Sequence, residues 1–273
     1  MKAIVNSPVC PLMSQPRRDC EMADEALFGM VVDVLERTTA DYCRVRTHYR
    51  YEGYVCVDDL ILSDEAAEYW AGLPKKVVLH KNFCDVMADP RVQSWQRLTL
   101  PRGAVVSPVG EPEKGWQRVK LPDGSEGYVR AGWLGEYFDA PPEIPEDELR
   151  QRIVDTAMLY AGTQYRGGGK SPLGIDCSGL TSMAYLLNGI FIYRDARIVE
   201  GFPVHEISRE EMKPGDLLFV PGHIAMYIGN GQYCHSTGRA GDDGFVVNSL
   251  DPSAPDYRAD LAGMISQIGS YFA

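Results

Sequence analysis

The sequence predicts a multidomain α+β protein, in which two small all-β domains precede one α+β domain. Two observations carry this prediction: the N-terminal half repeats itself, and after residue 145 helical periodicity replaces a pattern of short strands. The chain has 273 residues, enough for two or three domains of ordinary size. Its content of 45% hydrophobic and 24% charged residues is typical of a globular protein.

The N-terminal repeat keeps one register over its whole length. Adding 74 to a residue number maps the first copy onto the second without a gap, so that Gly29 falls on Gly103 and Tyr42 falls on Trp116. The tetrapeptide Glu52-Gly53-Tyr54-Val55 returns as Glu126-Gly127-Tyr128-Val129. Such a long match without an insertion indicates two copies of one structural unit.

Each copy contains short alternating apolar runs bounded by turn-forming or polar residues. In the first copy these runs are Met30–Leu35, Tyr42–Arg46 and Gly53–Val57. About 65 residues with such strands and no long helix favour a small barrel. We therefore expect two all-β domains over residues 1–72 and 73–140.

The third domain is expected over residues 141–273, behind the proline-rich linker Ala140–Pro145. Acidic residues 146–148 suit a helix N-terminus, and the apolar spacing that follows predicts a helix ending near Gly162. A second amphipathic stripe runs from Leu180 to Leu187. The pattern then predicts strands, over residues 216–220, 223–229, 232–236 and 245–248.

Cys177, His223 and His235 are the candidate catalytic residues. Cys177 stands at the expected start of a helix, where free backbone N–H groups and the helix dipole lower the pKa of a thiol, as does a protonated His partner. The N–H of Cys177 or Ser178 could also stabilise an oxyanion. His223 would be the general base and His235 would fix its tautomer.

The spacing of the two histidines constrains the hairpin between them. A two-residue turn at Asn230-Gly231 would pair Met226 with His235 and place the two imidazoles on opposite faces. A three-residue loop, Gly229-Asn230-Gly231, would pair Ala225 with His235 and place both imidazoles on one face. We expect the longer loop, with a glycine in the left-handed conformation.

Neither a metal site nor a cofactor is expected. A zinc site built from Cys177, His223, Cys234 and His235 fails because Cys234 faces away from His235 and no tight ligand pair exists. Glycines 167–169 lack the following residues of a phosphate loop, so nucleotide binding is not expected.

The charge and cysteine content bear on partners and compartment. A net charge of −11 argues against nucleic acid as a partner and disfavours membrane binding, and no apolar run approaches 18 residues. The seven scattered cysteines and the absence of a signal-peptide pattern favour a cytoplasmic location; a secreted protein whose signal peptide was removed is the alternative.

Several motifs of the third domain resemble those of the NlpC-type cell-wall peptidases, which are papain-like cysteine enzymes. The motifs are Tyr165–Gly168, Asp176–Leu180, Pro214–Leu217, His223–Gly229 and Tyr233–His235. The order of motifs in the repeat resembles bacterial SH3-like domains. The whole arrangement resembles γ-D-glutamyl-L-diamino acid endopeptidases, which implies two SH3-like barrels followed by a papain-like α+β catalytic domain.

The resemblance also implies a substrate. It is a small peptide, L-Ala-γ-D-Glu-diamino acid, with a free N-terminal L-Ala and with meso-diaminopimelate or L-Lys as the diamino acid, hydrolysed during murein peptide recycling. The family's Cys, His and His fall on Cys177, His223 and His235. An acyltransferase on the same fold and a secreted hydrolase of the same chemistry are the alternatives.

The substrate-binding residues are assigned from the same resemblance. Asp176 and Glu21 would bind the L-Ala ammonium, with Glu25 as a competitor for Glu21. The chain departs from the family's pattern after its Arg-Asp-Ala segment, where Ile198-Val199-Glu200 lacks the usual Gln. The other residues that would face the substrate are Tyr165, Ser178, Arg194, Asp195, and Tyr51 or Tyr54.

Overall fold

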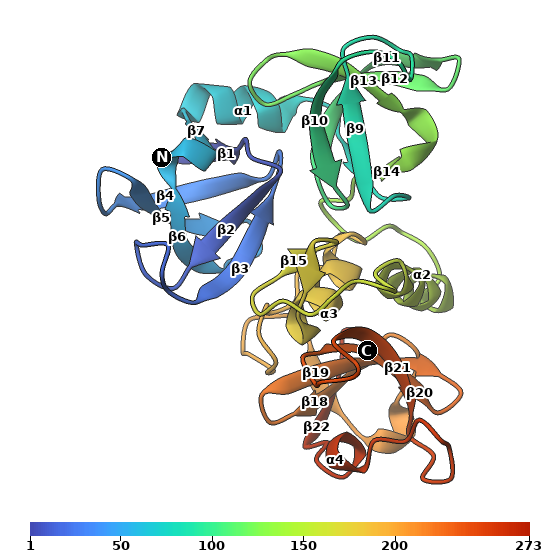
Figure 1. Ribbon diagram of the computed structural model, residues 1–273. Helices are drawn as coiled ribbons and strands as arrows, with labels where there is room; N and C mark the ends of the chain where they lie inside the picture. The colour runs from blue at the N-terminus through green and yellow to red at the C-terminus, as the bar shows by residue number, and fades with distance from the viewer. The chain divides into compact units, whose positions relative to one another are not determined.

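The computed structural model describes residues 1–273. The chain forms two compact units, Met1–Tyr137 and Phe138–Ala273 (Figure 1, blue to green and yellow-green to red). The division into three domains at residues 72 and 140 stays a prediction.

The first unit contains two antiparallel sheets of seven strands each. The first sheet has the order β3-β2-β6-β5-β4-β1-β7. Its strands are β1 Lys2–Val5, β2 Val9–Met13, β3 Met22–Leu27, β4 Val31–Arg37, β5 Tyr42–Thr47, β6 Glu52–Cys56 and β7 Leu60–Leu62. The second sheet has the order β10-β9-β13-β12-β11-β8-β14. Its strands are β8 Lys76–Val78, β9 Phe83–Met87, β10 Gln96–Pro101, β11 Val105–Glu113, β12 Trp116–Lys120, β13 Glu126–Arg130 and β14 Leu134–Glu136.

The two sheets follow the register of the sequence repeat. Their strand orders correspond one to one, and β2, β3, β6 and β7 recur 74 residues later as β9, β10, β13 and β14 with identical lengths. Each sheet also has a one-turn 3-10 helix at the equivalent place, Val57–Asp59 and Ala131–Trp133. The repeat read from the sequence is therefore a repeat of structure.

Helix α1 (Asp64–Gly72), which the sequence analysis did not predict, connects the two sheets. Ser63 caps its N-terminus by accepting a hydrogen bond from the Ala66 N–H. Its buried Trp70 packs in one cluster with Ile4 of the first sheet and Val105 of the second, and the indole N–H donates to the Gly29 carbonyl at 2.8 Å. The helix thus joins the two copies through a shared core.

The second unit combines three helices with a six-stranded antiparallel sheet of order β17-β22-β18-β19-β20-β21. Its strands are β17 His205–Ile207, β18 Leu217–Val220, β19 His223–Gly229, β20 Gln232–Thr237, β21 Gly244–Ser249 and β22 Gln267–Ser270. A separate pair is formed by β15 Lys170–Ser171 and β16 Gly174–Ile175. The helices are α2 Glu146–Met158, α3 Cys177–Leu186 and α4 Ala259–Ala262.

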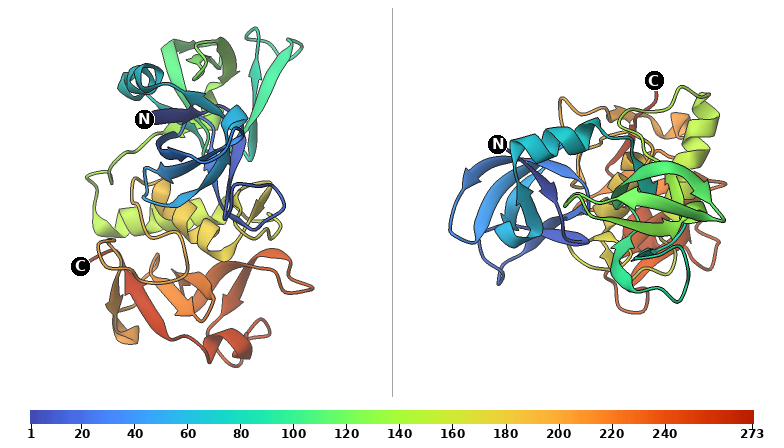
Figure 2. Two further views of the ribbon diagram at one scale, coloured as in Figure 1. Left: turned by 90° about the vertical axis from the view of Figure 1, so that its left-hand side faces the viewer. Right: turned by 90° about the horizontal axis from the view of Figure 1, so that it is seen from above.

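Helices α2 and α3 lie on the same side of the sheet (Figures 1 and 2), and α3 contacts β19 and β20. The predicted first helix is shorter than expected, since α2 ends at Met158 and a turn leads to Gly162. Alternation along the strands leaves Leu218, Ala225, Tyr233 and Ile268 on the other face, where Leu261 of α4 packs against them. The sheet therefore has an apolar layer on each side.

A buried ion pair fixes α2 to the start of β18. The Arg150 guanidinium lies 2.9 Å from the Asp216 carboxylate, and both side chains are at least nine-tenths buried. Arg150 also donates to the Pro214 carbonyl at 3.0 Å, and its guanidinium stacks on the Phe272 ring.

None of the helices is long and apolar enough to cross a membrane.

Candidate active site

Cys177 is the first residue of α3, as the sequence predicts. Asp176 is the N-cap, and its carboxylate accepts the Gly179 N–H at 2.6 Å. Cys177 is 7% exposed, so only a small part of the residue reaches solvent. The residue is thus largely buried at the positively polarised end of a helix.

Glycines allow the start of α3 to pack closely against the preceding loop. A Cβ on Gly179 would overlap the carbonyl oxygen of Gly169, and a Cβ on Gly169 would overlap the carbonyl oxygen of Gly174. No flexible side chain could give way at either place, because the obstacle is backbone. These glycines therefore set the position of the turn that carries Asp176 and Cys177.

The Asp176 carboxylate is held by several donors. Besides Gly179, the Gly168 N–H donates to it at 2.7 Å, and the buried Arg194 guanidinium binds both carboxylate oxygens at 3.0 and 3.1 Å. Arg194 also donates to the Ser178 hydroxyl at 2.6 Å. The three predicted residues Asp176, Ser178 and Arg194 thus form one buried network beside Cys177.

The β19–β20 hairpin places both histidines on one face, as predicted. Met226 pairs with Cys234 and Tyr227 with Tyr233, the register in which Ala225 lies opposite His235. The predicted pairing is thus confirmed, but the predicted three-residue loop is wrong. The turn has two residues, Asn230 and Gly231, with φ of 54° and 70°. A register shift between Tyr227 and Gly229, with φ of 96° at Gly229, restores the predicted pairing.

The two imidazoles are in direct contact. The Nε2 atom of His223 lies 2.9 Å from the Nδ1 atom of His235, and the ring planes are almost perpendicular. His223 directly precedes Ile224, whose backbone N–H hydrogen-bonds to the Cys177 sulfur. The hairpin therefore brings the His pair to the helix start that carries the thiol.

The predicted lowering of the thiol pKa is wrong. Burial raises the pKa of Cys177 above its ordinary value of 9.0, and the neighbouring Asp176 charge adds to this effect. Hydrogen bonds from the backbone N–H groups of Ile224 and Ser178, together with Arg194, act in the opposite direction without reversing the shift. Burial therefore favours the thiol form of Cys177 in the free protein.

Burial also keeps both imidazoles neutral. It lowers the pKa of His223 from 6.5 to about 4, helped by the charges of His235 and Arg258. Burial lowers the pKa of His235 as well, against the opposing effect of its hydrogen bond with Asn248. A neutral His223 is able to accept a proton, which a general base requires.

Asn248, which the sequence analysis did not single out, completes the chain of contacts. Its Oδ1 atom lies 2.9 Å from Nε2 of His235, and its Nδ2 group donates to the Asp256 carbonyl at 2.8 Å. Asn248 pairs with Tyr233 across β21 and β20, two residues from the partner of His235. An Asn on the histidine-bearing face of a predicted strand is the signal that could have identified it.

Tyr165 lies in the loop before β15 and is 38% exposed. Burial, and next the charges of Cys177 and Asp176, raise the pKa of its phenol. Its ring would contact a Cβ added at Gly238. Tyr165 thus lies close enough to the thiol for their charges to interact, and its role toward the substrate stays a prediction.

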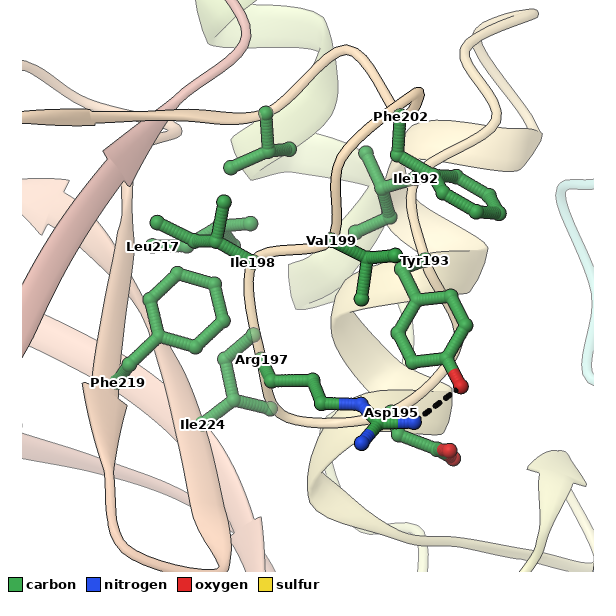
Figure 3. Close-up of a pocket in the computed structure, with 11 residues that line it drawn as sticks. Ile192, Tyr193, Asp195, Arg197, Ile198, Val199, Phe202, Leu217, Phe219 and Ile224 are labelled. Atoms are coloured by element: carbon green, nitrogen blue, oxygen red, sulfur yellow. Dashed lines mark hydrogen bonds between the residues drawn. The ribbon is translucent and has the colours of Figure 1, made fainter.

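Arg194 and Asp195 point to different surroundings. Arg194 faces Asp176, whereas Asp195 lines a small pocket between the 192–204 segment and strands β18 and β19 (Figure 3). The pocket is mainly apolar, with Ile198 and Val199 in its lining where the family's Gln was missing. Arg197 donates to the Tyr193 hydroxyl at 2.7 Å at its edge.

The remaining predicted residues belong to the first unit. Glu21 is exposed directly before β3, while its competitor Glu25 is 1% exposed within that strand. Tyr51 and Tyr54 are both half-buried, so Tyr54 is not part of the barrel core. Substrate binding by Glu21, Tyr51 or Tyr54 stays a prediction.

Comparison with known proteins gives matches in both units. Residues 162–254 match the NlpC/P60 family, and residues 12–60 match the bacterial dipeptidyl-peptidase Sh3 domain. Dipeptidyl-peptidase 6 of Lysinibacillus sphaericus is 44% identical over all of both chains. Gamma-D-glutamyl-L-lysine dipeptidyl-peptidase of Bacillus cereus is 32% identical over 89% of this chain and 74% of its own.

A solved structure supports the same fold. The crystal structure of an NlpC/P60 family protein from Bacillus cereus has a TM-score of 0.80 and 21% identity, and the match covers all of both chains. The sequence motifs around Cys177, His223 and His235, the fold and the full-length relative all agree. The chain belongs to the NlpC/P60 family of cysteine peptidases, with an SH3-like domain in its N-terminal unit.

Proposed function

We propose that this protein hydrolyses the bond between γ-D-Glu and a diamino acid in cell-wall muropeptides with a free N-terminal L-Ala. The observation that carries the proposal is the His223–His235 contact of 2.9 Å, in a hairpin whose Ile224 N–H hydrogen-bonds to the sulfur of Cys177 at the start of α3. The names of the relatives support the substrate class, because two of them are dipeptidyl-peptidases that match along most or all of this chain.

The proposed reaction begins with proton transfer from the Cys177 thiol to His223. The sulfur attacks the γ-carbonyl carbon of D-Glu, and backbone N–H groups at the start of α3 stabilise the oxyanion. His223 then returns the proton to the amine of the diamino acid, which leaves as the carbon–nitrogen bond breaks. A water molecule, deprotonated by the same imidazole, hydrolyses the thioester and regenerates the thiol.

Selection of a free L-Ala amine is the finer part of the proposal, and Glu21 and Asp176 are its proposed carboxylates. The Asp176 carboxylate already accepts hydrogen bonds from Arg194 and from two backbone N–H groups. Because that ion pair offsets its charge, we expect Glu21 to contribute more to the selection of the ammonium group.

The domain arrangement and location are proposed in the same way. We infer that the second sheet of the first unit is another SH3-like domain, because its strands repeat the order of the first. We propose a role in peptide recycling in the cytoplasm, which the seven free cysteines favour; secretion is the alternative.

The test is cleavage of L-Ala-γ-D-Glu-meso-diaminopimelate, of its L-Lys analogue and of their N-acetylated forms. We expect cleavage of the free-amine peptides only and no activity in the Cys177→Ala variant. Glu21→Gln should raise KM for the free-amine peptide, while Glu36→Gln, an exposed site on β4, should leave KM unchanged. Equal cleavage of acetylated peptides would refute the amine selection, and transfer to an added amine in place of hydrolysis would indicate an acyltransferase.

A further inference from the structure

The side chain of Asn248 can adopt one orientation only. Its partner on one side is the Asp256 backbone carbonyl, 2.8 Å away, and a carbonyl oxygen accepts hydrogen bonds but cannot donate them. The Nδ2 group must therefore face Asp256, which leaves the Oδ1 atom facing His235 at 2.9 Å. The Asp256 carbonyl oxygen thus fixes the amide orientation in which Oδ1 faces His235.

This orientation determines the tautomer of His235. Because Oδ1 only accepts, the Nε2 atom of His235 must carry its proton and donate it. In a neutral imidazole the other nitrogen, Nδ1, is then unprotonated and can only accept. His235 is fully buried, and burial disfavours its charged form, so a doubly protonated ring is not favoured.

The tautomer of His223 follows from that of His235. Its Nε2 atom lies 2.9 Å from the unprotonated Nδ1 of His235, so Nε2 must be the donor. The proton of a neutral His223 is thereby placed on Nε2, and its Nδ1 keeps a free lone pair. The opposite tautomer would set two lone pairs against each other across this contact.

We propose that Asn248 is a positioning residue which, oriented by the Asp256 carbonyl, fixes His235 and His223 as Nε2–H tautomers and leaves Nδ1 of His223 to take the proton of Cys177. The last step rests on the proposed function, whereas the tautomers do not depend on it. The arrangement extends the Cys-His-His set by one side chain and one backbone carbonyl.

The direct test is nuclear magnetic resonance of the full chain with ¹⁵N-labelled histidine at neutral pH. The chain has five histidines, so single substitutions of the exposed His48, His80 and His205 identify three signals and leave the two that belong to His223 and His235. We expect both catalytic-site rings to carry a proton on Nε2 and none on Nδ1. A proton on Nδ1 of either ring would overturn the proposal.

The Asn248→Leu variant removes the acceptor while keeping a side chain of similar size. Its His235 and His223 signals should show mixed tautomers, and kcat should fall about 10- to 100-fold with KM within about twofold. Val247→Ala is the matched control, because Val247 pairs with Cys234 and points to the opposite face of the sheet. Unchanged tautomers and kcat in Asn248→Leu would refute the role of Asn248.

The alkylation rate of Cys177 by iodoacetamide separates this proposal from the proposed function. The rate needs no peptide substrate and should fall in Asn248→Leu along with kcat, because His223 would less often present a free Nδ1. A wild-type protein that cleaves none of the muropeptides but shows both Nε2–H tautomers would leave the tautomer proposal intact. The proposed substrate alone would then be wrong.

Discussion

Asp176 combines two structural tasks next to Cys177, the proposed nucleophile. Its carboxylate caps α3 through Gly179 and fastens the preceding loop through Gly168. The Arg194 guanidinium, 2% exposed, compensates the buried negative charge from the other side. Removing Arg194 would leave an uncompensated buried carboxylate beside a thiol whose ionisation Asp176 already opposes.

The protonation states of Cys177 and His223 belong together. Burial raises the pKa of the thiol above 9.0 and lowers the pKa of the imidazole to about 4, so the neutral pair is favoured between these values. The resting pair is therefore a thiol and a neutral imidazole, and in the proposed reaction the thiolate forms as the proton moves to His223.

We predict that the resting enzyme shows no thiolate absorbance from Cys177 at neutral pH. The measurement is the ultraviolet difference spectrum between the wild type and Cys177→Ala, in which the other six cysteines cancel. The thiolate band should emerge only above pH 9, because the thiol pKa is raised above 9.0. A band already present at pH 6 would mean a preformed thiolate–imidazolium pair instead.

Helix α3 depends on a backbone approach that only glycine permits. Its third residue, Gly179, lies against the Gly169 carbonyl, so the helix start and the loop that carries Gly168 form one rigid corner. The position of the Cys177 thiol therefore depends on the whole helix start and not on Cys177 alone.

We predict that Gly179→Ala displaces the start of α3 and abolishes most of the activity. The added methyl group would overlap a carbonyl oxygen that cannot move without opening the Asp176 network. Overpacking of this kind costs about 1–3 kcal/mol of unfolding free energy, measured by denaturant titration followed by amide exchange in α3. The matched change Ser182→Ala, which removes a single bond to the Gly179 carbonyl, should have little effect on either measurement. Full activity in Gly179→Ala would show that the corner is not needed.

The elements that the sequence predicts well are those fixed by local patterns. The 74-residue register reproduces β2, β3, β6 and β7, and strand alternation places His223 and His235 on one face. The bulge at Gly229 escaped prediction because a two-residue turn with a bulge and a three-residue loop give the same pairing. Asn248 escaped it although it lies on a predicted strand, because the strand pattern alone does not fix the register that places it beside His235. The raised thiol pKa escaped it because it depends on burial in the folded chain.

The two compact units have separate hydrophobic cores, and the unfolding of each can be followed by a different signal. One cluster of the first unit is built around Val86, Val106 and Val129, and one cluster of the second around Leu218 and Ile268. All four tryptophans, Trp70, Trp95, Trp116 and Trp133, belong to the first unit. Tryptophan fluorescence therefore follows the unfolding of the first unit, while exchange of β19 and β20 amides follows the second.

We predict that mild acid destabilises the second unit selectively. His223 has a folded pKa of about 4 against 6.5 when unfolded, so the unfolded state binds its proton first as the pH falls. The stabilisation is complete above pH 6.5 and is lost as the pH falls towards 4, with about 2 kcal/mol lost between pH 8 and pH 5 from His223 alone. His235 changes stability in the same direction, since its pKa is also lowered.

Tryptophan fluorescence and amide exchange in β19 and β20 should therefore respond differently as the pH falls. Protection of the β19 and β20 amides should decrease from pH 8 to pH 5 after correction for the intrinsic exchange rate, and the loss should be smaller in His223→Gln. The tryptophan transition in urea should shift much less, because His48 and His80, the histidines of the first unit, are exposed. Equal acid sensitivity of both signals, or an undiminished loss in His223→Gln, would contradict a buried neutral imidazole as the cause.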